Sequence, residues 1–171
     1  MDILATVSGL AYQFGLPGLL LASIIVNATV FIVVPIVELA VVGLAAAQVY
    51  PPILLGLTAG LGAGIGELTG YFVGSQGRHL VQHFSAKETG IMHRVQKMLS
   101  VHTWKGTATI FILASVPFPF DVIGVAAGLA KFPLPNFFVA ATAGKMVRFT
   151  VLAYAALWGF TTIVNVFVHG A

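Results

Sequence analysis

The chain has 171 residues, of which 58% are hydrophobic and only 8% are charged, and its mean hydropathy is +1.01. Soluble domains carry charge on about a quarter of their residues. This composition therefore excludes a soluble globular protein and indicates a single-domain, multi-pass protein of the cell membrane over residues 1–171. The absence of cysteine excludes disulfides, thiol catalysis and cysteine-bound metals.

Five apolar segments follow one another along the chain, and they predict an all-α membrane fold. They cover residues 16–30, 31–49, 51–74, 106–130 and 137–168. The first predicts an N-terminal transmembrane helix. The last is long enough to tilt, to break at Gly159 or to turn back.

The second and fourth segments are interrupted by prolines, and each has an acidic residue beside the interruption. Pro35 and Glu38 lie in the second, and Pro117, Pro119 and Asp121 in the fourth. Each is either a kinked span or a re-entrant hairpin, whose broken backbone must line a cavity buried in protein or filled with water.

An internal repeat favours the hairpins. A shift of 81 residues places VVGLAA (41–46) on VIGVAA (122–127), Pro52 on Pro133, and Glu67 on Arg148. We therefore expect two inverted halves, at about 27–74 and 106–160, each with a re-entrant hairpin followed by a transmembrane helix. Inverted repeats with broken helices at the midplane are typical of transporters.

The linker between the halves, residues 75–105, gathers five basic residues against one acid, so the positive-inside rule places it in the cytoplasm. Apolar residues recur at helical spacing over 91–99, which predicts an amphipathic helix that lies on the membrane with Trp104 as anchor, or packs on the protein's own core. His79 and His83 have the spacing of a metal pair, but without a third ligand we expect no metal or cofactor. No pattern of basic and aromatic residues indicates nucleic-acid binding.

Glycines recur every four residues in the third segment and form two adjacent rows on one helix. The rows are Gly62, Gly66, Gly70 and Gly74, and Gly56, Gly60 and Gly64. Such rows let membrane helices approach closely, so they predict helix packing.

Ionisable residues at membrane depth are costly and usually functional. The candidates are Glu38, Glu67 and Asp121, with Lys145 and Arg148 on one face of the last helix. We expect the acids of one half to meet the bases of the other, with Glu67 facing Arg148. The alternative is that these residues form purely structural ion pairs. Buried ion pairs stabilise proteins poorly, which argues against this alternative.

Three stretches resemble the DedA superfamily, also called the VTT or SNARE-associated family, and its YqaA-like branch in particular. They are NATVFIVVPIVE (27–38), GELTGYFVGSQGR (66–78) and the run from Val116 to Lys145 that begins VPFPFDVIG. The resemblance covers about residues 27–159, and Glu67 stands at the acidic position of the family's GDxxGY motif. The better-studied branch carries two arginines around the second hairpin proline, where this chain has Ala114 and Phe120.

The resemblance implies a lipid transporter, a flippase or scramblase of phospholipids or polyprenyl phosphates, with proton coupling left open. Lys145 and Arg148 would then bind the phosphate headgroup, and Glu38, Glu67 or Asp121 would carry protons. A proton-coupled exporter of small molecules or ions is one alternative, and a non-transporting scaffold is another. No nucleophile–base pair points to an enzyme, and the sequence leaves open a homo-oligomer.

Overall fold

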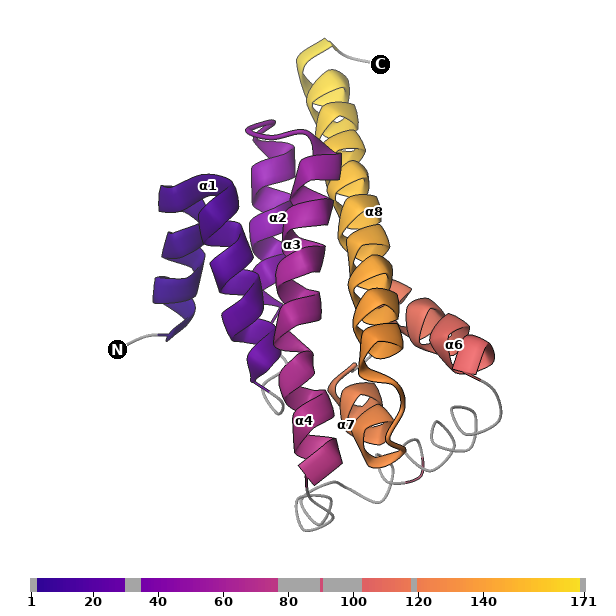
Figure 1. The fold of residues 1–171 in the computed structure, drawn as a ribbon. Coiled ribbons are helices and arrows are strands. Elements are labelled where there is room, and N and C mark those ends of the chain that lie inside the picture. The colour runs from indigo at the N-terminus through magenta and orange to yellow at the C-terminus, as the bar shows by residue number, and fades with distance from the viewer. Residues whose placement is uncertain (1–2, 30–34, 77–89, 91–102, 118–119, 170–171) are drawn as a thin grey trace.

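Every regular element in the described part of the chain is an α-helix. The computed structural model describes residues 3–29, 35–76, 90, 103–117 and 120–169, and residues 3–12 and 163–169 only by their backbone. The helices are α1 (Ile3–Ala28), α2 (Ile36–Ala46), α3 (Pro52–Gly66), α4 (Leu68–Gln76), α6 (Thr103–Ser115), α7 (Asp121–Leu129) and α8 (Leu134–His169) (Figure 1). Most of the predicted linker, including the amphipathic helix at 91–99, lies outside the described residues.

Within the described residues, two helices are long and apolar enough to cross a membrane. One is α3 with α4, Pro52–Gln76, and the other is the part of α8 from Leu134 to Thr162. Glu67 separates α3 from α4 but keeps right-handed helical dihedral angles (φ −63°, ψ −17°), so the two continue in one direction. Helix α8 runs through Gly159 without a break, so the last segment neither breaks nor turns back there.

The predicted N-terminal transmembrane helix differs from the structure. Helix α1 begins at Ile3 and kinks at Gly15 (φ 59°, ψ −135°), so its straight part after the kink, which ends at Ala28, is shorter than a typical span. The kink needs glycine because of its positive φ, and because a Cβ there would lie 2.3 Å from the Tyr50 hydroxyl. The part after the kink packs against α2 and α3.

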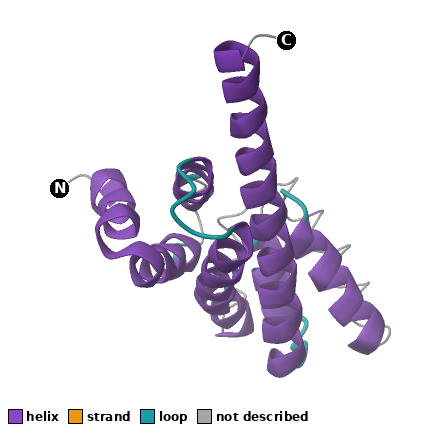
Figure 2. Ribbon diagram, turned by 90° about the horizontal axis from the view of Figure 1, so that it is seen from above, coloured by secondary structure: helices purple, strands orange, loops and turns teal. Residues whose placement is uncertain are grey.

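The two glycine rows do pack helices, as predicted. Ideal Cβ atoms on Gly56, Gly60 and Gly64 would collide with α8, and those on Gly62 and Gly66 would collide with α1. Gly70 and Gly74 face α7 instead. Helix α3 is thus enclosed between α1 and α8, and α6 lies on the other side of α8 (Figure 2).

The short helices α2 and α7 pack across the two halves of the sequence. Helix α2 contacts α8, and α7 contacts α4, so each lies against the long helix of the other half. The α2–α3 turn and the α7–α8 turn lie at opposite ends of the long helices (Figure 1). Both short helices therefore begin near the middle of the molecule and run outward in opposite directions.

The two turns after the short helices share one backbone pattern. Val49 N–H donates to Leu44 O (3.1 Å) and Phe132 N–H to Ala127 O (3.0 Å), and the residues before them, Gln48 (φ 54°) and Lys131 (φ 52°), are left-handed. This is the Schellman ending of a helix.

The equivalent residues of the two turns are 83 positions apart, whereas the sequence repeat predicted 81. Apolar residues of the two halves can be aligned at several shifts, whereas the shared helix ending allows only one. At this register Glu38 corresponds to Asp121, and each of these acids lies in the first turn of its helix.

Candidate functional site

A buried ion pair joins the two long helices near their middles. Lys145 Nζ, on α8, lies 2.7 Å from Glu67 Oε1, at the α3–α4 boundary, and the two side chains are only 5% and 2% exposed. Glycines bring the helices this close, because Gly64 and Thr142 touch one turn away on the same seam. The second carboxylate oxygen of Glu67, Oε2, has no hydrogen-bond partner among the described residues. One oxygen of Glu67 thus binds Lys145, and the other is available to accept a further hydrogen bond.

Helix α1 supplies the rest of the lysine's surroundings. Lys145 Nζ also donates to Asn27 Oδ1 (3.1 Å), and Asn27 Nδ2 donates to the carbonyl oxygen of Ser23 (2.8 Å). Ser23, fully buried, donates its hydroxyl to Ala59 O on α3 (2.7 Å). This chain of hydrogen bonds fixes the position of the ammonium group relative to α1, α3 and α8.

A second ion pair lies one helical turn further along α8. Arg148 Nη2 lies 2.6 Å from Glu38 Oε1 in the first turn of α2, and the side chains are 18% and 27% exposed. The prediction that Glu67 faces Arg148 is therefore wrong, because the partner of Glu67 is Lys145. Lys145 and Arg148 share a face, but α3 with α4 meets the lysine and α2 meets the arginine. The wider prediction, that acids of the first half meet bases of the second, is confirmed for both pairs.

Helix α7 begins beside the Glu67–Lys145 pair. The ring of Phe120, 2% exposed, has its centroid 5.2 Å from Lys145 Nζ, which is cation–π distance. Asp121 follows it in the first turn of α7, and Gly70 packs against the Asp121 carbonyl. Asp121 has no ion pair among the described residues. It is the third carboxylate of a centre that holds two cations.

The prolines lie at the starts of the short helices, as far as they are described. Pro35 precedes α2 directly, and Pro117 lies between α6 and α7. Pro119 is outside the described residues, as are His79 and His83. Within the described parts no group of three or more metal-ligating side chains occurs.

Several residues of the centre were missed by sequence reasoning. Asn27 is the one side-chain amide in the first apolar segment, which was the available signal for it. Tyr71 lies four positions after Glu67, and its hydroxyl donates to Phe132 O (2.6 Å), which joins α4 to the α7–α8 turn. Ser23 and Thr142 gave no signal, because small hydroxyl residues are common in membrane helices.

Comparison with known protein families assigns the chain. The family model of the VTT domain matches residues 34–157, which is most of the chain. The chain belongs to the VTT-domain family. It is therefore a membrane protein of the DedA/SNARE-associated superfamily, in agreement with its two membrane-length helices. It matches no curated protein sequence and no solved structure. Its assignment to the YqaA-like branch stays a prediction.

Proposed function

We propose that this VTT-domain protein transports membrane lipids with phosphate headgroups, as a flippase or scramblase, through the charged centre formed by the two ion pairs. The observation that carries the proposal is the position of these pairs. Arg148 lies in the middle third of α8, and Lys145 and Glu67 are buried beside it. Charges at this depth are costly and usually belong to a substrate or proton pathway, and a phosphate needs cations on its way across.

The proposal includes two re-entrant hairpins that meet at this centre. Helices α2 and α7 have 11 and 9 residues, too few to cross a membrane, and both start beside prolines. Their N-termini adjoin the Lys145–Arg148 segment, and backbone N–H groups at helix N-termini favour anions. The inverted directions of the two halves support an alternating exposure of this centre to the two leaflets.

Lys145 offers a replacement for the two arginines of the better-studied DedA branch. The two positions at which that branch carries arginine are Ala114 and Phe120 here. A Cβ on Gly144 would lie 2.6 Å from Ala114 Cβ, and the Phe120 ring faces Lys145 itself. Ala114 therefore packs against the residue before the lysine, and Phe120 contacts the lysine itself. A cation on α8 would replace the missing hairpin arginines.

The test measures lipid movement in liposomes that contain the purified protein. A fluorescent phospholipid and a fluorescent polyprenyl phosphate are followed between leaflets, with and without a proton gradient. We expect Lys145→Met to stop movement and Lys145→Met/Phe120→Arg to restore part of it. Lys131→Gln removes a cation at the α7–α8 turn, outside the centre, and serves as the matched control. A folded native protein that moves neither lipid would overturn the proposal.

A proton-coupled exporter of small molecules or ions is the second candidate, and one observation favours it. The centre holds three carboxylates and two cations, and both cations already have carboxylate partners. As it stands, the centre matches a proton or a cation better than an anion. An exporter predicts solute movement that depends on Asp121 while lipids stay in their leaflets. A scaffold predicts instead that neutral substitutions of Glu38, Glu67 and Asp121 leave the biological role intact.

A further inference from the structure

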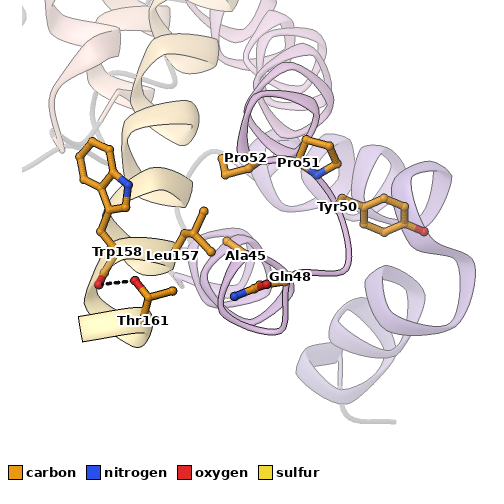
Figure 3. Close-up of a pocket in the computed structure, with 8 residues that line it drawn as sticks. All are labelled: Ala45, Gln48, Tyr50, Pro51, Pro52, Leu157, Trp158 and Thr161. Carbon is orange, nitrogen blue, oxygen red and sulfur yellow. Dashed lines mark hydrogen bonds between the residues drawn. The ribbon is translucent and has the colours of Figure 1, made fainter. Parts of the chain in front are cut away.

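A cavity lies far from the charged centre, where the α2–α3 turn meets the distal part of α8. Its volume is about 500 Å³, within the range of small-molecule sites. Pro51, Pro52 and Leu157 provide apolar walls, and Trp158 stands at its edge (Figure 3). The side chain of Gln48 extends from the turn toward α8 (Figure 3). None of the ion pairs takes part in this cavity.

Its depth in the membrane follows from the helix that forms one wall. Trp158 follows Arg148 by ten positions on α8, and this is about 15 Å along the axis at the usual helical rise. Pro51 and Pro52, which also line the cavity, stand at the beginning of the membrane-length helix Pro52–Gln76, so the cavity lies at one end of that helix, where acyl chains meet headgroups. Trp158 is 66% exposed and contacts Tyr154, an aromatic pair of the kind that marks this boundary.

The polar side chains that line the cavity carry no charge. Gln48 contributes an amide and Thr161 a hydroxyl, which donates to Trp158 O (3.0 Å). Tyr50 directs its hydroxyl away, against Gly15 of α1. Neutral donors and acceptors above apolar walls match the ester and glycerol groups of a diacyl lipid, whereas a phosphate would need cations.

We propose that this cavity binds the glycerol–ester region of a diacyl lipid from the leaflet opposite the 75–105 stretch, with the Gln48 amide as its hydrogen-bonding group. The inference rests on the proposed function, because it supplies the place where a lipid docks before or after passing the charged centre. Binding in the cavity is nevertheless measurable without any transport.

The experiment uses Trp158 as its own reporter. The chain has two tryptophans, so Trp104→Phe leaves Trp158 alone, and Trp158→Phe leaves Trp104 alone. Each protein, in detergent micelles, is titrated with phosphatidylcholine brominated near the ester groups. We expect quenching of Trp158 to saturate at a low mole fraction of lipid, and quenching of Trp104 to rise only in proportion to it. Proportional quenching of both tryptophans would overturn the inference.

The variant Gln48→Gly tests the role of the Gln48 side chain without changing the backbone of the turn. Gln48 has the left-handed backbone that glycine prefers (φ 54°), so this change keeps the turn and deletes the amide. In the Trp104→Phe background we expect about a tenfold rise in the half-saturating mole fraction, as for one lost neutral hydrogen bond. Lys131→Gly makes the same exchange at the opposite turn and should change nothing. If Gln48→Gly binds lipid as tightly as the parent, the role assigned to the amide is wrong.

The same proteins distinguish failure of this inference from failure of the proposed function. Saturable quenching in a protein that moves no lipid in liposomes would support the cavity and refute lipid transport. Lipid movement without saturable quenching would support transport and refute the cavity. Where quenching of Trp158 saturates, the variant Thr161→Phe, which adds a large side chain to the lining of the cavity, should abolish the saturation.

Discussion

Replacing Glu67 with leucine leaves the Lys145 ammonium group buried without its carboxylate. Removing one partner of a buried pair costs about 3–5 kcal/mol of stability, since the remaining charge is neither hydrated nor neutralised. Here Lys145 keeps the Asn27 acceptor at 3.1 Å and the Phe120 ring at 5.2 Å. We therefore expect a loss near the lower end, about 3 kcal/mol. Lys145→Met should cost a similar amount, because it leaves Glu67 buried.

The double variant Glu67→Leu/Lys145→Met removes both charges and fills their space with apolar atoms. Replacing an entire buried pair in this way is often neutral or stabilising, so we expect stability within about 1 kcal/mol of the native protein. The two single losses would thus fail to add. The double variant should still move no lipid.

The assay is equilibrium unfolding in mixed micelles for all four proteins, followed by the liposome assay on those that fold. A double variant as unstable as the sum of the single ones would refute the reasoning about the pair. A stable double variant that transports at the native rate would show that the pair is structural, which was the alternative left open by the sequence.

Other predictions follow from single contacts. Gly60→Ala should unfold at lower denaturant than the native protein, because its Cβ would lie 2.5 Å from the α8 backbone, whereas Gly70→Ala, with its nearest atom at 3.7 Å, should stay close to native. Tyr71→Phe should cost about 1 kcal/mol in the same unfolding assay, since Phe132 O loses its donor. Arg148→Gln should destabilise less than loss of the buried lysine, because its pair is partly exposed, yet it should slow lipid movement at least as much.

The sequence predicted those features that depend on spacing alone. Glycines four apart must lie on one helix face, so the close packing of α3 on α1 and α8 could be predicted from Gly60, Gly62 and their repeats. Charges inside apolar helices must find partners, so the meeting of the two halves was also predictable. Neither prediction requires knowing how one helix is rotated about its axis relative to another.

The sequence did not predict features that depend on such rotation or on a single backbone angle. Whether Glu67 meets Lys145 or Arg148 depends on how α8 is turned, and these two lie on the same face. The kink of α1 depends on the φ of Gly15, which apolar periodicity does not reveal. The repeat register was displaced by two residues for a similar reason, because apolar side chains align at many shifts while a helix cap aligns at one.

The charge count of the centre links headgroup charge to proton movement. Both ion pairs cross the halves, with the acid from the first half. Asp121, the counterpart of Glu38, therefore brings a third carboxylate without a third cation among the residues that the structure describes. A lipid with one net negative charge adds to this excess, and it can reach Lys145 or Arg148 only if a carboxylate leaves or takes up a proton. A zwitterionic lipid adds no net charge.

Lowering the pH should therefore accelerate the movement of phosphatidylglycerol more than that of phosphatidylcholine in the same liposomes. In Asp121→Asn, which removes the excess charge, the difference between the two lipids should shrink at every pH. Equal pH dependence of both lipids in the native protein would mean that the headgroup does not enter the charged centre at all.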